Sequence, residues 1–318
     1  MKWHTRLTEL LQIKYPIMQG GLAYLGYSDL AAAVSNAGGF GQITAMSLPD
    51  AKTLREEIER TRTLTDKPFG INFAIGMHRG DMEERIRIAI EERVSAVTLT
   101  GGNPAPFMPL LQSASLTTLV LVSSRTQAQK AEQLGASAVI VVGHEGGGHL
   151  GRDEVGTMVL VPQIVDAVRI PVVASGGISD GRGWMACHAL GAEGIVMGTR
   201  FIATKECVRA SSSYKNALVK ATSADTVVIK RSISSPARVL RSPLIDEFME
   251  LESETNDSEA LKRYINGEAN KRWIYESNQE EGFGWAGQAV GLINDIPEVS
   301  ELIQRMVREA EIIRSKWF

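Results

Sequence analysis

Residues 171–201 read PVVASGGISDGRGWMACHALGAEGIVMGTRF. The segment begins with an apolar run typical of a buried strand, passes through Gly176 and Gly177 into a helix candidate at 180–190, and ends in a second apolar run at 194–197. Two parallel strands need a crossover connection between them, and a helix is the usual one. This stretch therefore predicts a unit of an α/β fold with a parallel sheet.

The same alternation extends from this unit back to the start of the chain. The predicted strands lie at 16–19, 40–43, 69–73, 96–99, 118–122, 138–142, 171–174 and 194–197. Helix candidates with apolar residues at three- and four-residue spacing separate them, at 28–37, 49–62, 81–93, 104–112, 125–134, 157–168 and 180–190. Eight strands in strict alternation favour a (β/α)8 TIM barrel, with a doubly wound sheet as the alternative.

The alternation stops after the eighth strand. Residues 205–284 are richer in charge and helix-like, and residues 297–318 return to helical spacing. We therefore expect a barrel formed by residues 1–204 and 285–318, with a small, mainly helical lid inserted at 205–284. The alternative is a helical appendage that mediates contact in a homodimer. A length of 318 residues fits a barrel of roughly 250 residues plus an insertion.

Composition narrows the class of protein. The net charge of −3 comes from well-mixed signs, so the chain offers no broad basic surface for nucleic acid. No apolar run approaches the roughly 18 residues of a membrane span. The N-terminal segment lacks an apolar signal region, and Cys187 and Cys207 match no disulfide or metal pattern. We expect a cytoplasmic protein that binds a small molecule.

Glycine recurs directly after the predicted strands, where parallel barrels carry their functional groups. Gly176 and Gly177 follow the seventh strand, and Gly198 and Thr199 follow the eighth. Barrels often bind a phosphate with the backbone amides of these two loops. The two loops together predict a phosphate site, although either one alone is better explained as a tight turn.

Two familiar motifs fail on their spacing. Residues 146–151, GGGHLG, match G-x-G-x-x-G, but the glycines do not open a helix directly, and the acidic residue expected about 20 positions later falls within a helix candidate. His144 and His149 are five positions apart across three glycines, whereas a helical zinc motif needs four. The sequence therefore predicts neither a Rossmann fingerprint nor a metal site.

His149 is the best candidate for catalysis. It lies on a glycine-rich loop that leaves the sixth strand, and an imidazole near its ordinary pKa of roughly 6.5 exchanges a proton at neutral pH. The alternative is a structural histidine that fixes the loop.

Amides and apolar side chains at the strand ends suit a heterocycle. Gln19 and Asn72 end the first and third strands, and both would hydrogen-bond a ring such as a flavin, or else cap loop backbone. Met18, Met197 and Phe201 would pack on the ring or belong to the core.

Taken together, these loops resemble the nitronate monooxygenase family. The matching motifs are PIMQGG at 16–21, NAGG at 36–39, GIN at 70–72, EGGGH at 145–149, SGGI at 175–178, MGTRF at 197–201, and GQ at 287–288 with GLI at 291–293. The resemblance covers nearly the whole chain.

The resemblance implies an FMN-binding barrel with a lid. It implies phosphate loops at Gly176, Gly177, Gly198 and Thr199, and His149 as the catalytic residue, which takes the α-proton of a nitroalkane or orients a nitronate while FMN accepts electrons and oxygen reoxidises it. The expected cofactor-binding set is Met18, Gln19, Gly20, Gly21, Asn72, Gly147, Gly148, Ser175, Gly176, Gly177, Met197, Gly198, Thr199 and Gln288.

The pattern is also similar to the FMN-dependent enoyl-acyl-carrier-protein reductases, which would need NAD(P)H as a co-substrate. Residues 181–183 and 236–240 resemble that branch, whereas Gly146 stands where those reductases usually carry serine. A third hypothesis is a barrel that binds a phosphate-bearing ligand without redox catalysis.

Overall fold

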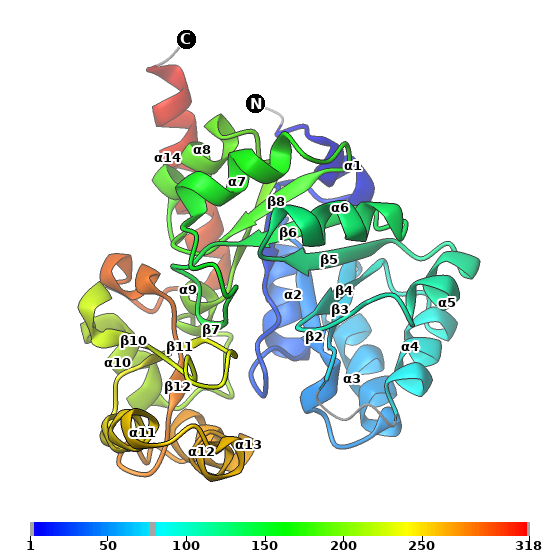
Figure 1. Ribbon diagram of the computed structural model, residues 1–318. Coiled ribbons are helices and arrows are strands. Elements are labelled where there is room, and N and C mark those ends of the chain that lie inside the picture. Colours follow the sequence, from blue (N-terminus) through cyan, green and yellow to red (C-terminus); the bar gives the residue numbers. More distant parts are fainter. Residues whose placement is uncertain (1–2, 77–80, 317–318) are drawn as a thin grey trace.

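The computed structural model describes residues 3–76 and 81–316. Within these residues, eight parallel strands curl into a TIM barrel (Figure 1). Their order is β1-β9-β8-β6-β5-β4-β3-β2, and a parallel bridge between Met18 and Phe40 joins the two ends of this order. The strands are β1 (Ile17–Gln19), β2 (Gly41–Thr44), β3 (Phe69–Ala74), β4 (Ala96–Thr100), β5 (Thr118–Val122), β6 (Ala138–Val142), β8 (Val172–Ser175) and β9 (Gly194–Met197). The predicted barrel is confirmed, and the doubly wound alternative is wrong.

Helices surround the strands. They are α2 (Ser28–Asn36), α3 (Ala51–Leu64), α4 (Met82–Glu91), α5 (Met108–Ser113), α6 (Arg125–Gln133), α7 (Thr157–Val165), α8 (Gly181–Ala189) and α14 (Val299–Ser315). Helix α14 packs against both α8 and α2, which is the place of the eighth barrel helix. The last two residues of the helix predicted at 297–318 lie outside the described residues.

The strands form because their sequences suit burial on both faces. Strand β6 has the sequence AVIVV, and all of it is buried. Such β-branched runs are typical of parallel strands that are covered on one face by helices and on the other by the barrel interior. Helix α1 (Arg6–Leu11), which precedes the barrel, places Leu7 and Leu11 in the same apolar cluster as Met18 and Phe40.

The segment between β9 and α14 contains helices and a small antiparallel sheet. The helices are the short α9 (Thr199–Ile202), then α10 (Ser212–Lys220), α11 (Pro243–Glu254), α12 (Ser258–Tyr264) and α13 (Gly267–Ile274). The strands are β10 (Thr226–Ile229), β11 (Ala237–Leu240) and β12 (Gly284–Trp285). Ile229, Val239, Phe248 and Phe283 form a separate apolar cluster with neighbours from these elements. The sequence analysis predicted the helices and missed the sheet.

This sheet is joined to the barrel by a strand that the sequence did not predict. Strand β7 (Gly148–His149) lies in the loop after β6 and pairs antiparallel with β11, so that His149 is opposite Ala237. In Figure 1, β7 lies between the barrel and the inserted segment. The pairing therefore attaches the inserted segment to the loop that carries the candidate catalytic histidine.

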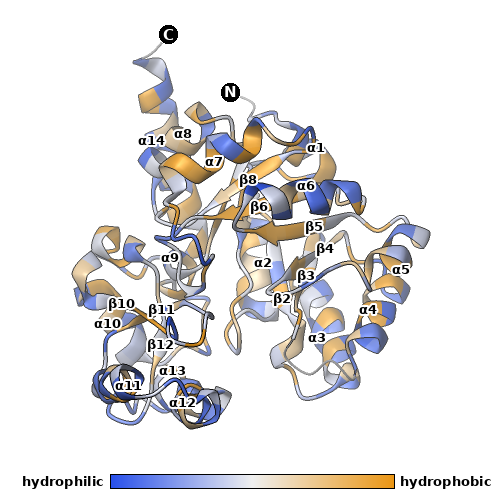
Figure 2. Cartoon of the chain, viewed as in Figure 1, coloured by the Kyte–Doolittle hydropathy of each residue, from blue (hydrophilic) through white to orange (hydrophobic). Residues whose placement is uncertain are grey.

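Hydropathy follows this division. Figure 2 shows the barrel strands in orange, whereas α11 and α12 are largely blue. None of the helices in the described ranges combines the length and apolar character needed to cross a membrane.

Candidate functional site

The loops at the carboxyl ends of β6, β8 and β9 are bound to one another. The Glu145 carboxylate accepts hydrogen bonds from the Thr157 N–H at the start of α7, at 2.8 Å, and from the Thr157 hydroxyl, at 3.0 Å. The same hydroxyl lies 2.9 Å from the Gly176 carbonyl oxygen. In the loop after β9, Thr199 Oγ1 accepts a hydrogen bond from the Gly287 N–H at 3.0 Å.

The two predicted phosphate loops have the backbone form that the prediction requires. Gly176 and Gly177 have φ angles of +98° and +77°, a conformation that side chains with a Cβ rarely adopt. The N–H groups of Gly176, Gly177, Gly198 and Thr199 donate no hydrogen bond to protein atoms in the described part of the chain. Amides held this way leave donors for an anionic group.

The loop after β1 lies beside these amides. Gly20 donates its N–H to the Met197 carbonyl oxygen at 2.9 Å, which brings the ends of β1 and β9 together. Gly147 is packed so closely that an added Cβ would lie 2.6 Å from the Gly287 nitrogen. Gln288 donates its backbone N–H to the Glu145 carbonyl oxygen at 2.9 Å. The predicted positions Gly20, Gly147 and Gln288 are therefore brought to one edge of the barrel.

The Gln19 side chain is buried and pairs with Gln42 on β2. Its Nε2 donates to the Gln42 carbonyl oxygen at 2.9 Å, and its Oε1 accepts from the Gln42 N–H at 3.2 Å. In return, the Gln42 side chain donates to the Gln19 carbonyl oxygen at 2.6 Å. Both polar ends of the Gln19 side chain are occupied by protein, so the capping interpretation of this residue is the one that the structure supports.

Asn72 differs, because one end of its amide is free. Thr98 donates its single hydroxyl proton to Gln42 Oε1 at 2.7 Å, so it must accept from Asn72 Nδ2, which is 2.9 Å away. Asn72 Oδ1 then faces Gly21, where an added Cβ would lie 2.2 Å from it. Among the described residues, no group donates to this oxygen.

The apolar residues predicted to pack on a ring are in the core. Met18, Met197 and Phe201 are all completely or almost completely buried. Met18 is opposite Val196 in the sheet register and shares the interior cluster of Phe40. For these three side chains, the structure agrees with the core alternative.

His149 lies on β7 among residues of the inserted segment. Its ring centroid is 5.5 Å from that of Trp285, and its Nε2 is 3.1 Å from the Nζ of Lys230. Desolvation, and then the positive charge of Lys230, lower the pKa of His149 to about 4. The residue nevertheless remains exposed, and an added Cβ at Gly148 would meet no atom of the described residues within 4 Å. The imidazole is thus neutral at pH 7 and borders open space.

The second histidine of the same loop has a different setting. His144 donates its N–H to the Val155 carbonyl oxygen, and its own carbonyl oxygen accepts from Arg238 Nη2 at 3.1 Å. Desolvation, followed by the charge of Arg238, lowers the pKa of His144. His144 is therefore a loop residue beside a buried guanidinium.

Sequence reasoning missed Lys230 and Trp285. Lys230 follows β10 in the inserted segment, 81 positions from His149, and no motif includes it. Desolvation lowers the pKa of Lys230 to about 8, although Glu252 opposes the shift. A signal was present for Trp285, because it lies two residues before the GQ motif at 287–288. Nothing in the pattern indicated contact with His149.

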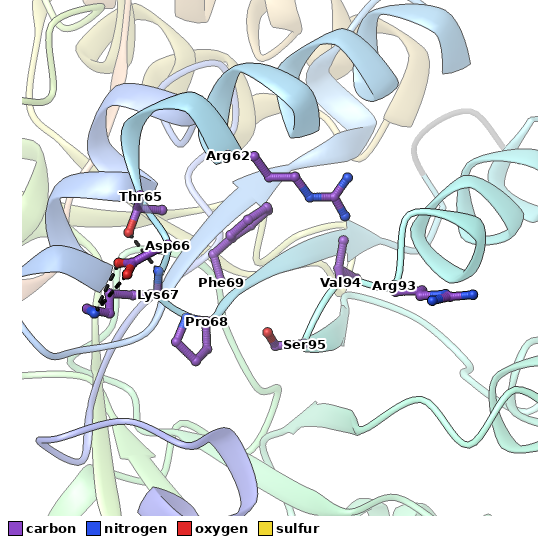
Figure 3. Close-up of a pocket in the computed structure, with 9 residues that line it drawn as sticks. All are labelled: Arg62, Thr65, Asp66, Lys67, Pro68, Phe69, Arg93, Val94 and Ser95. Carbon is purple, nitrogen blue, oxygen red and sulfur yellow. Dashed lines mark hydrogen bonds and ion pairs between the residues drawn. The ribbon is translucent and has the colours of Figure 1, made fainter.

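A surface pocket of about 410 Å³ lies elsewhere, at the amino ends of β3 and β4 (Figure 3). Two of the basic residues that line it are paired with carboxylates: Arg62 with Glu92 at 2.6 Å, and Lys67 with Asp66 at 3.0 Å. Catalytic groups of parallel barrels lie at the carboxyl ends of the strands. This pocket is therefore separate from the candidate site.

Comparison with known proteins gives one family. A model described as nitronate monooxygenase matches residues 4–79 and 73–309. The structure of FabK from Thermotoga maritima superposes with a TM-score of 0.93 at 39% identity, covering 99% of this chain and 98% of that one.

Two curated relatives are similar at about the same level. A probable nitronate monooxygenase of Staphylococcus saprophyticus is 32% identical over 99% of this chain and 100% of that protein. The (3aS,4S,5R,7aS)-5-hydroxy-7a-methyl-1-oxo-octahydro-1H-indene-4-carboxyl-CoA dehydrogenase of Rhodococcus jostii is 33% identical over 96% of this chain and 95% of that protein. Relatives with different substrates are thus equally similar.

Proposed function

The chain belongs to the nitronate monooxygenase family and is an oxidoreductase, and we propose that it uses FMN to oxidise alkyl nitronates with O2 beside His149. One observation carries the proposal: the unpaired amides after β8 and β9 and the neutral imidazole on β7 lie at the same edge of the barrel. A phosphate-bearing redox cofactor and a reacting substrate need these two features together.

The residues at this edge fit FMN. The N–H groups of Gly176, Gly177, Gly198 and Thr199 would hold its phosphate, because they have no protein partner in this part of the chain. Asn72 Oδ1 would accept a hydrogen bond from the ring system. When bound, FMN supplies a two-electron acceptor next to the substrate.

The lowered pKa of His149 favours a nitronate over its parent nitroalkane. A group that titrates at about 4 is a weak base, so it is poorly suited to remove a proton from carbon. A nitronate has already lost this proton and needs only to be oriented. We therefore assign His149 the role of hydrogen-bonding and orienting the substrate.

The visible spectrum of the purified protein under anaerobic conditions tests the proposal. We expect a yellow protein whose flavin absorption is bleached by a propyl nitronate, and not by NADH or NADPH alone. A protein that stays colourless after incubation with FMN would contradict every flavin-dependent function and favour the non-redox, phosphate-binding barrel.

A second candidate function is the NAD(P)H-dependent reduction of an enoyl thioester. The observation in its favour is the 39% identity to FabK, an enoyl-acyl-carrier-protein reductase, over 99% of this chain. In this case NADH or NADPH would bleach the flavin without nitronate, and an enoyl thioester would restore the colour. The same cuvettes therefore discriminate between the two functions.

We retain two further expectations as part of this proposal. Residues 205–284 would act as the lid over this edge of the barrel. Buried, free Cys187 and Cys207 agree with the reducing conditions of a cytoplasmic location.

A further inference from the structure

Lys230 belongs to the inserted segment but its ammonium group lies at the candidate catalytic residue. Its Nζ is 3.1 Å from His149 Nε2 and 5.7 Å from the centroid of the Trp285 ring. No motif in the sequence accounts for Lys230. We propose that Lys230 contacts the substrate, holding an oxygen that carries negative charge next to His149, and that the inserted segment thereby supplies a residue of the active site; this rests on the proposed oxidoreductase function.

The donor capacity of the ammonium group is the first argument. An ammonium group has three N–H donors and no acceptor, so His149 Nε2 must accept from it. This contact places the imidazole proton on Nδ1. Within residues 81–316, the other two donors of Lys230 make no hydrogen bond to protein, which leaves them available to a substrate oxygen.

The backbone around Lys230 is the second argument. Its φ angle is +61°, a left-handed conformation that costs free energy for a residue with a Cβ. Glu252 on α11 holds this turn, because its carboxylate accepts from the Lys230 N–H at 2.9 Å and from the Ser232 N–H at 3.0 Å. Strained residues that the surroundings hold in place are concentrated at functional sites.

Strand pairing is the third argument. Ala237 on β11 is opposite His149 on β7, and Leu150 donates its N–H to the Pro236 carbonyl oxygen at 2.9 Å. The turn that carries Lys230 is thus fixed to the His149 loop through backbone hydrogen bonds. The backbone that carries Lys230 therefore has a defined position relative to the His149 loop.

Charge gives the class of substrate. Three titratable groups surround Lys230: His149, which is neutral, Glu252, which binds the backbone of its turn, and Arg231, which is paired with Glu154 at 2.6 Å. Desolvation lowers the pKa of Lys230 to about 8, so the group is mostly protonated at pH 7. A cation beside a neutral imidazole suits a nitronate or, in the second candidate function, the enolate that forms from a thioester.

Three variants of the flavin-loaded protein test this role. Lys230→Met removes the charge, Lys230→Arg keeps it, and Arg231→Met removes the neighbouring charge, which contacts Glu154 and not His149. With propyl nitronate we expect Lys230→Met to lower kcat/KM at least about tenfold, mostly through KM, because a charge-assisted hydrogen bond to the substrate is lost. Lys230→Arg should retain most of the activity, and Arg231→Met should match the wild type.

The pH profile separates this role from a merely structural one. Above pH 8 the wild type should lose kcat/KM for the nitronate as Lys230 loses its proton, whereas Lys230→Arg should keep its activity, because a guanidinium stays charged. Equal profiles for wild type and Lys230→Arg, or an unchanged KM in Lys230→Met, would overturn the proposal.

A measurement without turnover keeps this test independent of the proposed function. In ¹⁵N NMR of the histidine rings, Lys230→Met should raise the pKa of His149, because desolvation remains and the nearby positive charge is gone. An unchanged pKa of His149 would overturn the contact itself. If the contact is present and nitronate fails to bleach the wild-type flavin, the proposed function is wrong and the pair must act on another substrate.

Discussion

The two sides of the candidate site are built in different ways. On the side of β8 and β9, Gly176, Gly177 and Thr199 lie directly after barrel strands, and their place follows from the strand order. On the other side, Lys230 and Trp285 come from the segment between β9 and α14, and the pairing of β11 with β7 helps to bring them to His149. The barrel side is positioned by the order of the strands, whereas the inserted side is positioned by long-range contacts, among them a short strand pairing.

Under the proposed function, this difference assigns cofactor binding to the barrel loops and substrate selection to the inserted side chains. Cofactor phosphates need backbone donors at fixed places, which strand ends provide. Substrate selection needs side chains that can differ between relatives without disturbing the barrel. The names of two relatives give different substrates, at 33% and 32% identity to this chain.

The largest expected effect is on the barrel side. Gly177→Asp should abolish FMN retention, because it adds a negative charge to the phosphate loop and a Cβ 3.3 Å from that of Glu145, at a φ of +77°. The measurement is the ratio of flavin absorbance to protein after gel filtration.

Gly76→Asp is the matched control for this substitution. Gly76 also has a positive φ, of +105°, and among the described residues an added Cβ there would meet no atom within 4 Å. The control should keep its flavin, so that a loss in Gly177→Asp reports the loop and not backbone strain in general. Normal flavin content in Gly177→Asp would show that the FMN phosphate does not bind at this loop.

The next effect is on the inserted side. His149→Ala should keep FMN but lower kcat/KM for the nitronate and for the parent nitroalkane by a similar factor of about tenfold, because a hydrogen bond that orients either substrate is lost. Steady-state kinetics with both substrates measure the two losses. A loss confined to the nitroalkane would contradict the orienting role and make His149 a proton-transfer group.

The smallest effect should come from a residue that belongs to neither side. Gln19→Leu should lower the free energy of unfolding by about 1–3 kcal/mol, because the buried backbone N–H and carbonyl oxygen of Gln42 lose the Gln19 side chain as their hydrogen-bond partner. Urea unfolding at saturating FMN measures this change. The apparent affinity for FMN should be unaltered. A large drop in that affinity would show that Gln19 belongs to the cofactor site.

Much of the fold was predictable because its signals are local. The strands 118–122, 138–142 and 194–197 agree with the structure to the residue, since β-branched runs between helical periods identify strands within short windows. Strand β7 was not predictable, because its two residues are Gly and His and pair with a strand almost 90 positions later. Its partner sheet was missed for the same reason.

The candidate site divides along the same line. Position after a strand was enough to predict that Gly20, Gly176 and Thr199 lie together. Whether Gln19 and Met18 contact a ligand or are buried depends instead on the direction of a side chain at a strand end. A one-residue change in register reverses that direction. Sequence patterns do not resolve register to this degree.

By itself, the sequence determined the alternation of strands and helices, the glycine loops at the strand ends and the presence of His149 on one of them. These depend on residue type and on spacing over a few positions. Only the tertiary structure decided that Gln19 is buried against Gln42 and that Lys230 meets His149. The physical reason is that such contacts join residues far apart in the chain, and sheet register, which local propensity does not encode, brings them within hydrogen-bonding distance.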